Sequence, residues 1–249
     1  MTLDSFQRLT EGYTITKIER RSKYIVFYIN RDSEQRILIS HLGMAGGFFV
    51  VDHLEQIAVP NYRKHWQVIF ELDNGKKLIY SDIRRFGEIR NVSSFDAYPS
   101  FLSIAPEPFD EDAMQHFLDI TNKKNYAKKP IKQVILDHKV ISGCGNIYAC
   151  EALFRAGILP SRLTQDLTQQ EKEMVFYHVR SVLNEGIKYG GTSISDYRHA
   201  DGKTGEMQLH LNVYKQKYCK VCGHSIETKV IACLLYTSDA ADDSLRLEL

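Results

Sequence analysis

The sequence predicts an α+β fold with a β-rich first part, a helical middle and a small β-hairpin module near its end. Three observations predict it. Residues 18–90 hold β-branched and aromatic runs of strand length. After Pro106-Glu-Pro108 the apolar residues recur at helical spacing. Residues 207–231, around Cys219-Lys-Val-Cys222, return to strand character. We find no internal repeats, so these parts are distinct modules.

The strands of the first part are bounded by turn signals. Tyr24–Ile29 and Arg36–Ser40 are β-branched and aromatic runs. Trp66–Leu72 and Lys77–Tyr80 flank Asp73-Asn-Gly75, a combination typical of a tight turn between antiparallel strands. The sequence therefore predicts a β-hairpin at this point.

The first helices are marked by a capping residue and a proline. Asp110 predicts the start of a helix that runs through Leu118. Pro130 suits the first turn of a helix over Ile131–His138. The basic, proline-punctuated stretch Asn122–Pro130 is the predicted linker between the β-rich and helical parts.

Two further helices follow. Gly145-Asn146 opens one that stops at Gly157. Thr168 and Glu171 form a capping box, and the helix that they begin ends at Gly190-Gly191. Four residues of this last helix form one apolar stripe: Val175, Val179, Val182 and Leu183.

The composition argues against a membrane protein, a secreted protein and a small protein held together by disulfides. Of the 249 residues, 25% are charged and 43% hydrophobic, as in a soluble globular protein with a real core. No apolar run approaches the length of a membrane span and the N-terminus lacks the layout of a signal peptide, so we expect neither membrane insertion nor secretion. Five cysteines, an odd number, argue for free thiols or metal ligands rather than a disulfide framework.

The net charge of +1 is unevenly distributed. Residues 233–249 hold four acidic residues and one arginine, a sum of −3, so the first 232 residues carry +4. That mild basicity is compatible with a nucleic-acid partner without requiring one. The abrupt change in composition also suggests that 233–249 is not part of the fold.

Cys219 and Cys222 have the spacing of half a zinc ribbon. Two intervening residues let both thiolates face one tetrahedral ion, and Gly223 lets the chain turn. A second such pair is absent, and the nearby candidates for further ligands are Cys233, His224 and His210. This single pair alone is only a modest signal for zinc.

Ser142-Gly-Cys-Gly-Asn146 is a glycine-bearing turn that opens a helix. Free N–H groups at a helix N-terminus, beside a short amide side chain, suit a phosphate. The alternative is an ordinary helix corner with Asn146 as its cap. A group of lysines lies just upstream, which is either a solvated face or part of a phosphate site: Lys123, Lys124, Lys128, Lys129 and Lys132.

Ser81–Gly87 follows a hairpin strand and places Arg84 and Arg85 beside Phe86. Such residues can hold a backbone phosphate and wedge a base step. The alternative is surface salt bridges and a core phenylalanine. Met44, at another strand end, is more often core filler than a probe, and Lys23 alone indicates nothing.

Taken in chain order, these motifs are similar to those of one family. The similarity runs from about Thr10 to Ala232 and rests on RRSKY (20–24), ISHLGMAG (39–46), DIRRFG (82–87), APEP (105–108), IKQVILDHKVISGCGNIYACEALFRAGI (131–158), GGTSISDY (190–197), ADGKTGEMQ (200–208) and VYKQKYCKVCGHSI (213–226). The chain resembles the bacterial formamidopyrimidine-DNA glycosylases, within the wider family that includes endonuclease VIII.

The resemblance implies a two-layer β-sandwich, a helix–two-turn–helix domain and a C-terminal zinc finger. We expect these over residues 1–108, 109–210 and 211–232, followed by a non-native tail over 233–249. It also implies excision of oxidised purines (8-oxoguanine and formamidopyrimidines) from duplex DNA, followed by strand cleavage through β- and δ-elimination. The partner is then double-stranded DNA with oxidised purines or abasic sites, bound by a monomer in the bacterial cytoplasm.

The resemblance also assigns roles to residues by motif. Lys23 matches a proton donor for β-elimination. Met44, Arg84 and Phe86 match the three residues that fill the gap left by the extruded base, and the segment Ser195–Met207 matches a loop that closes on that base. Four further residues match DNA contacts, the last two of them at a pinched phosphate: His65, Lys128, Lys132 and Asn146.

The sequence departs from the family pattern at both ends. The family begins Met-Pro-Glu, where the amine of proline is the nucleophile, whereas Met1-Thr-Leu-Asp matches inside the first domain. We therefore expect a β-sandwich without its first strands and a catalytically inactive chain. The family's single zinc ion also needs a second cysteine pair, so we expect weak zinc binding through Cys219 and Cys222 alone.

Two other interpretations stay open. A non-catalytic protein that binds damaged DNA would keep the binding surface without the reaction. A helix–two-turn–helix nucleic-acid module of the ribosomal-protein or topoisomerase kind is a third possibility. His41-Leu-Gly-Met44 and Asp82–Gly87 argue against that module, because a simple binder needs no base-step wedge.

Overall fold

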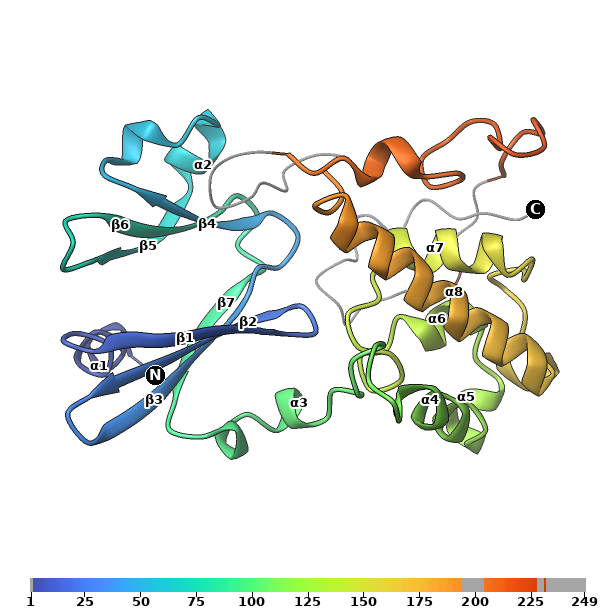
Figure 1. Ribbon diagram of the computed structural model, residues 1–249, viewed down its shortest axis with the longest axis horizontal. Coiled ribbons are helices and arrows are strands. Elements are labelled where there is room, and N and C mark those ends of the chain that lie inside the picture. Colours follow the sequence, from blue (N-terminus) through green and yellow to red (C-terminus); the bar gives the residue numbers. More distant parts are fainter. Residues whose placement is uncertain (1, 194–203, 228–230, 232–249) are drawn as a thin grey trace.

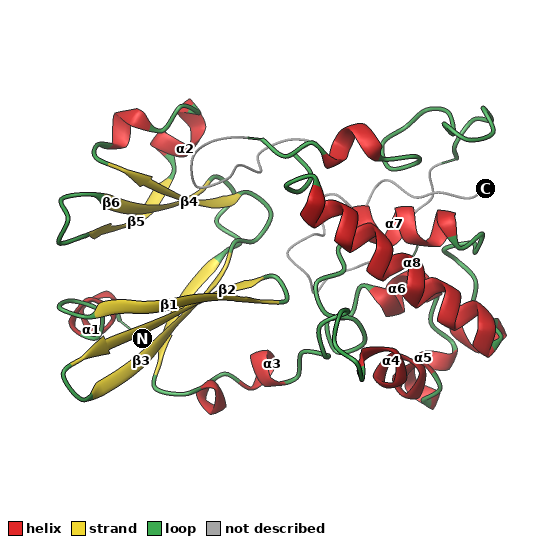
Figure 2. Ribbon diagram, viewed as in Figure 1, coloured by secondary structure: helices red, strands yellow, loops and turns green. Residues whose placement is uncertain are grey.

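The computed structural model describes residues 2–193, 204–227 and 231. The expected tail over 233–249 and most of the segment Ser195–Met207 lie outside the described residues. Figure 1 shows two parts side by side, joined along one edge by the segment that carries α3 (Pro99–Leu102). All strands lie in the first part and most helices in the second (Figure 2).

Two antiparallel sheets form the first part. One sheet has the order β1-β2-β3-β7 and the other β4-β6-β5. Their strands are β1 (Thr14–Arg21), β2 (Tyr24–Arg31), β3 (Glu34–His41), β4 (Gly46–Val51), β5 (Trp66–Glu71), β6 (Lys77–Asp82) and β7 (Glu88–Val92). Phe27 and Leu38 of the first sheet pack against Phe48 and Tyr80 of the second in one buried cluster. The predicted two-layer β-sandwich is therefore confirmed.

The predicted hairpin joins β5 to β6. The Leu72 N–H donates to the Lys76 carbonyl at 2.9 Å and closes a three-residue turn. Gly75 lies in the left-handed region, with φ of 80°, where a side chain would be strained. The Asp-Asn-Gly signal is thus confirmed by the geometry that it predicts.

The helical part surrounds one apolar core. Its helices are α4 (Ala113–Thr121), α5 (Lys124–Ala127), α6 (Ile131–Ile135), α7 (Asn146–Arg155) and α8 (Gln169–Lys188), whereas α1 (Leu3–Arg8) and α2 (Pro60–Lys64) lie in the first part. The capping box of α8 is confirmed: the Glu171 N–H donates to Thr168 Oγ1 at 3.2 Å, and the Thr168 N–H to Glu171 Oε2 at 2.8 Å. The stripe residues Val175, Val179 and Val182 are fully buried.

Three details of the predicted helices and linker are wrong. The helix expected from Asp110 begins at Ala113, because the Asp110 carboxylate accepts the Glu107 N–H at 2.8 Å instead. The helix expected to reach His138 ends at Ile135 as α6, and its chain turns where the Lys139 N–H donates to Asp137 Oδ1. The stretch 122–130 is not a linker, since Tyr126 of α5 is buried in the helical core.

The strands expected over 207–231 are also not found in the described residues. Met207–His210 is a 3₁₀ turn, and only Tyr218 and Ser225 form a β-bridge. The backbone N–H groups of Val213 and Tyr214 instead donate to Glu151 of α7, both at 2.9 Å. The buried Glu151 carboxylate thus takes donors that a strand would use. Among the described residues, no helix is both long enough and apolar enough to cross a membrane.

Candidate nucleic-acid interface

The three residues expected to fill the gap left by an extruded base lie together, and we call them the wedge cluster: Met44, Arg84 and Phe86. Arg84 Nη1 lies 3.0 Å from Met44 Sδ, and its guanidinium lies 4.9 Å from the centre of the Phe86 ring. Phe86 is 51% exposed, which excludes the alternative that it is a core residue. An exposed aromatic ring with a guanidinium against its face is suited to insertion into a stacked base step.

Two glycines bring the loops of the wedge cluster into backbone contact. A Cβ atom on Gly43 would lie 2.7 Å from the backbone nitrogen of Gly87, so the loop before β4 rests directly on the loop after β6. His65 lies next to the same loop, because its carbonyl accepts the Asp82 N–H at 3.0 Å. The predicted DNA contact His65 is therefore adjacent to the wedge cluster.

A second group of predicted residues meets where α7 begins, and we call it the anion cluster: Lys23, Lys132 and Asn146. Lys23, in the turn between β1 and β2, places Nζ 3.3 Å from where a Cβ atom on Gly145 would lie. Burial raises the pKa of the neighbouring Cys144 to about 12, against the opposing effect of the Lys23 and Lys132 ammonium groups. Both charges therefore act on the same turn.

Helix α7 points its N-terminus into the anion cluster. Gly145 is the N-cap, and Asn146 is the first helical residue, so the alternative that Asn146 is a simple cap is wrong. Lys132, on α6, is 2% exposed, and its Nζ has no hydrogen-bond partner among the described residues. A buried ammonium beside a positive helix end is stabilised by a bound anion. The arrangement can therefore hold a phosphate group.

Lys128 does not join these clusters. It is exposed at the end of α5, and no described contact ties it to Lys132 or Asn146. The neighbouring Lys129 lies over the ring of Tyr126 at 4.7 Å and does not extend into the anion cluster. Of the lysines singled out upstream, the structure brings only Lys132 to the start of α7.

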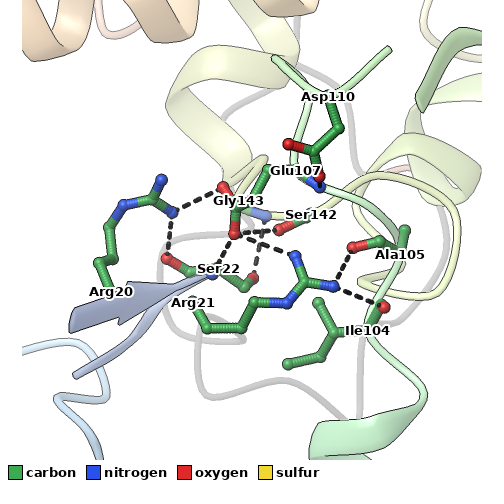
Figure 3. A network of polar contacts seen from close by, with 9 residues as sticks. All are labelled: Arg20, Arg21, Ser22, Ile104, Ala105, Glu107, Asp110, Ser142 and Gly143. Carbon is green, nitrogen blue, oxygen red and sulfur yellow. Dashed lines mark hydrogen bonds and ion pairs between the residues drawn. The ribbon is translucent and has the colours of Figure 1, made fainter. Parts of the chain in front are cut away.

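The carboxylate of Glu107, which no motif marks as functional, links the β-rich part to the helical part (Figure 3). Glu107 Oε1 accepts the Ser22 N–H at 2.6 Å and the Ser142 hydroxyl at 3.0 Å. Arg21 and Arg20 form ion pairs with it at 3.1 and 2.8 Å. The Gly143 N–H donates to Ser22 Oγ at 3.0 Å, which joins the same turn to the start of α7. This network, the interdomain joint, holds Lys23 against Gly145.

The sequence contains the residues of the interdomain joint but does not show that they meet. Glu107 stands between two prolines, and Arg20 and Arg21 precede Lys23, but 85 residues separate Ser22 from Glu107. Ser22 has a left-handed backbone, with φ of 55°, which a non-glycine residue adopts only when its surroundings hold it there. The contacts of Ser22 with Glu107 and Gly143 supply that restraint.

We expect Glu107→Gln to lower the free energy of unfolding by about 1–3 kcal/mol at neutral pH, because it removes the charge from two ion pairs. Burial alone would raise the pKa of Glu107, but the Ser22 N–H and the Arg20 guanidinium lower it below its ordinary value. The stabilisation is therefore present above the ordinary carboxylate pKa of about 4.3 and is lost as the pH falls through the lower folded-state value.

Thermal melting of both proteins across a pH series measures this effect. The wild-type and Glu107→Gln curves should differ at pH 7 and converge in acid. The exposed neighbour Glu111 provides the control, since Glu111→Gln should melt as the wild type does at every pH. Equal melting of wild type and Glu107→Gln at pH 7 would show that the interdomain joint does not stabilise the fold.

The cysteine pair forms a turn suited to metal binding. The Cys219 N–H donates to the His224 carbonyl at 2.8 Å, and the Val221 N–H donates to Cys219 Sγ at 3.4 Å. The Cys222 N–H, which also donates to this sulfur, lowers the pKa of Cys219. His210 instead stacks on Tyr189 at 3.7 Å. Within the described part of the chain, no three His, Cys, Asp or Glu residues gather as a metal site, and Cys233 lies outside that part.

Comparisons with known proteins agree with this geometry. The model of the formamidopyrimidine-DNA glycosylase N-terminal domain matches residues 1–89, and that of the H2TH domain of the same enzymes matches residues 104–198. Formamidopyrimidine-DNA glycosylase from Alteromonas mediterranea is 36% identical over 223 residues, which cover 89% of this chain and 79% of that protein. The Streptococcus agalactiae enzyme is 36% identical, over 89% of this chain and 78% of its own.

Solved structures show the same similarity. The MutM (Fpg) protein from Thermus thermophilus superposes with a TM-score of 0.78 and 33% identity, covering 90% of this chain and 81% of that one. Lactococcus lactis Fpg in complex with DNA that contains an abasic site superposes with a TM-score of 0.77 and 32% identity, covering 93% and 82%.

Proposed function

Because the chain belongs to the formamidopyrimidine-DNA glycosylase family, a family of DNA repair glycosylases, we propose that it binds duplex DNA at oxidised purines and abasic sites. We further propose that it serves base excision with AP-lyase chemistry. The observation that carries the proposal is the convergence of Met44, Arg84 and Phe86 at one exposed point of the β-sandwich. A protein that only binds the DNA backbone has no need of such a wedge.

The two clusters support complementary steps of recognition. The Phe86 ring would enter a base step, and the Arg84 guanidinium would fill the gap left when the damaged nucleotide turns out of the helix. The anion cluster would hold a backbone phosphate between the Lys132 ammonium and the N-terminus of α7 at Asn146. The interdomain joint would keep these two contacts at a fixed spacing.

Lys23 is our candidate for the proton donor in strand cleavage. In the family the amine of an N-terminal proline displaces the base and stays bonded to the sugar C1′, and elimination then breaks the strand. An exposed ammonium beside the phosphate-binding turn could donate a proton in that second reaction. No residue of 1–249 matches the Pro-Glu pair itself.

We also propose that Cys219 and Cys222 hold a zinc ion. Their turn fits the group, because backbone N–H groups already point at the Cys219 sulfur and favour its thiolate form. Bound zinc would supply structural stability to the segment after α8 and no reaction step. Two thiolates fill half of a tetrahedron, so we expect weak binding by residues 1–249 alone.

A second candidate is a monomeric protein that binds damaged DNA without excising the base. The observation that favours it is that both clusters found among the described residues serve binding alone. The wedge cluster and the anion cluster would serve both functions equally. The two candidates therefore share one binding prediction and differ in whether a covalent intermediate forms.

We expect the chain to prefer a duplex with an abasic site over the same duplex intact by about 10-fold or more. Arg84→Ala should reduce that preference by about 1–3 kcal/mol, because the gap is then left unfilled. Arg90→Ala is the matched control, since Arg90 lies on β7 and pairs with Glu88 of the same strand at 2.7 Å. Fluorescence anisotropy at a fixed salt concentration measures both affinities. Equal affinity of the wild type for the two duplexes would overturn the proposed function.

A further inference from the structure

A buried carboxylate lies directly beneath the wedge cluster. Asp82 is the last residue of β6, is 1% exposed, and forms no ion pair among the described residues. A buried charge without a counter-ion is unfavourable unless hydrogen bonds replace the water that it has lost. The hydrogen-bond donors around Asp82 therefore identify the part of the chain that this carboxylate holds in place.

The donors span the loop that carries the wedge cluster. Asp82 Oδ1 accepts the Arg84 N–H at 3.1 Å, and Oδ2 accepts the Gly87 N–H at 2.7 Å. The two oxygens thus hold residues two and five positions further along the chain. Arg85, between them, has a left-handed backbone with φ of 58°. An isolated loop would disfavour this conformation by about 1 kcal/mol or more, so its shape depends on the carboxylate.

The side chain of Tyr80 closes the network from below. Its hydroxyl donates to Asp82 Oδ2 at 3.3 Å. Burial, followed by the charge of Asp82, raises the pKa of Tyr80 far above its ordinary value, so this hydroxyl stays a donor at every physiological pH. A Cβ atom on Gly87 would overlap that hydroxyl, and only a glycine lets the loop approach it.

The same network fixes the third residue of the wedge cluster. Gly43 rests on the backbone of Phe86 and Gly87, so the loop that carries Met44 is stacked on the loop that Asp82 holds. Arg84 then reaches both Met44 Sδ and the Phe86 ring. The loop that Asp82 holds therefore carries Arg84 and Phe86 and contacts the loop that carries Met44.

We propose that Asp82 is a positioning residue that holds the wedge cluster in its DNA-inserting geometry before DNA arrives. The carboxylate touches no DNA and acts through the backbone of Arg84 and Gly87. Insertion into a base stack then costs less conformational entropy, because the loop is already ordered. This inference rests on the proposed function, since it assigns the wedge cluster a role in recognition of extruded or missing bases.

The test compares Asp82→Asn with a matched buried carboxylate, Glu151→Gln. Both substitutions keep the side-chain shape, and both replace an acceptor of backbone N–H groups; Glu151 does this in the helical part, where it holds the segment after α8. The probes are an intact duplex and an abasic-site duplex with 2-aminopurine opposite the abasic site. Its fluorescence rises when a wedge unstacks it, and anisotropy gives the affinity for each duplex.

Asp82→Asn should bind the intact duplex as the wild type does, because no DNA-facing charge has changed. Its preference for the abasic duplex should fall about 10-fold, and the 2-aminopurine signal should be lost. Glu151→Gln should keep the preference for the abasic duplex and the 2-aminopurine signal, although its melting temperature falls about as much as that of Asp82→Asn. Should Asp82→Asn fail to fold, Tyr80→Phe keeps the carboxylate and should lose about threefold in the same preference.

The outcomes separate this inference from the proposed function. Wild-type preference and fluorescence in Asp82→Asn, or in Tyr80→Phe where that variant stands in, would overturn the role of Asp82 and leave the proposed function standing. An equal loss in Glu151→Gln would also overturn it, since the effect would then follow from stability alone. Absence of both signals in the wild type would overturn the proposed function and this inference together.

Discussion

A polypeptide of residues 1–249 is expected to bind abasic-site DNA and to leave it uncut. Residues 1–249 hold no counterpart of the family's N-terminal Pro-Glu pair, whose amine forms the covalent intermediate, so we expect this polypeptide by itself to form no imine. The wedge cluster and the anion cluster are both present, so binding should persist. Reduction with borohydride in the presence of abasic-site DNA traps any imine, and a denaturing gel then shows the covalent complex.

We expect no trapped complex and no strand cleavage above the level without protein. The MutM (Fpg) protein from Thermus thermophilus, which covers 90% of this chain, is assayed beside it on the same DNA for comparison. A trapped complex would show that another amine of this chain attacks the sugar. Lys23 is the first to substitute in that case, because its ammonium lies beside the start of α7. Loss of the complex in Lys23→Met, with affinity for the abasic-site duplex retained, would identify it as the nucleophile.

The sequence predicted local structure best where one residue dictates the backbone. Gly75 and the capping box at Thr168 occur as expected, because each meets a steric or hydrogen-bonding need within a few residues. The prediction that a helix starts at Asp110 was wrong, because the local sequence allowed more than one hydrogen bond there. Its side chain had two local donors to choose from, and the Glu107 N–H, three residues back, competes with the helix start.

In the candidate site, too, residues within a motif could be identified from the sequence, and residues that act through distant contacts could not. The motifs assign Met44, Arg84 and Phe86 to one role, and in the structure these side chains lie together. The role of Glu107 was out of reach, because its partners lie 85 residues before it and 35 residues after it. Asp82 opens the motif DIRRFG (82–87), but nothing in the sequence shows that its carboxylate is buried and forms no ion pair with any described residue. Such roles depend on tertiary contacts.

Removal of the buried ammonium of Lys132 should stabilise the protein and weaken its binding to DNA at the same time. Lys132 is 2% exposed, and its Nζ has no hydrogen-bond partner among the described residues. Well-packed apolar residues that replace buried charged groups stabilise proteins by up to about 4 kcal/mol, and we expect a gain of about 1 kcal/mol or more here. For a chain of this size Lys132→Met should therefore raise the melting temperature by roughly 2–4 °C per kcal/mol gained.

The effect on DNA binding has the opposite sign. A phosphate at the start of α7 would compensate this ammonium, and the loss of such a charge-assisted contact costs about 1.5–3 kcal/mol, or roughly 10- to 150-fold in affinity. The slope of log affinity against log salt should also fall by about 1. Differential scanning fluorimetry and anisotropy over a salt series measure the two effects on the same samples.

Lys172 offers the control for this prediction. It is also buried, at 6% exposed, but its Nζ donates to Asn122 Oδ1 at 2.7 Å. Lys172→Met removes a compensated ammonium and leaves the Asn122 amide without its donor, so the melting temperature should not rise and DNA affinity should stay unchanged. Unchanged DNA affinity in Lys132→Met would show that its ammonium is not held for a phosphate. A gain in stability together with a loss of affinity would show that its charge is kept for the ligand at the expense of the free protein.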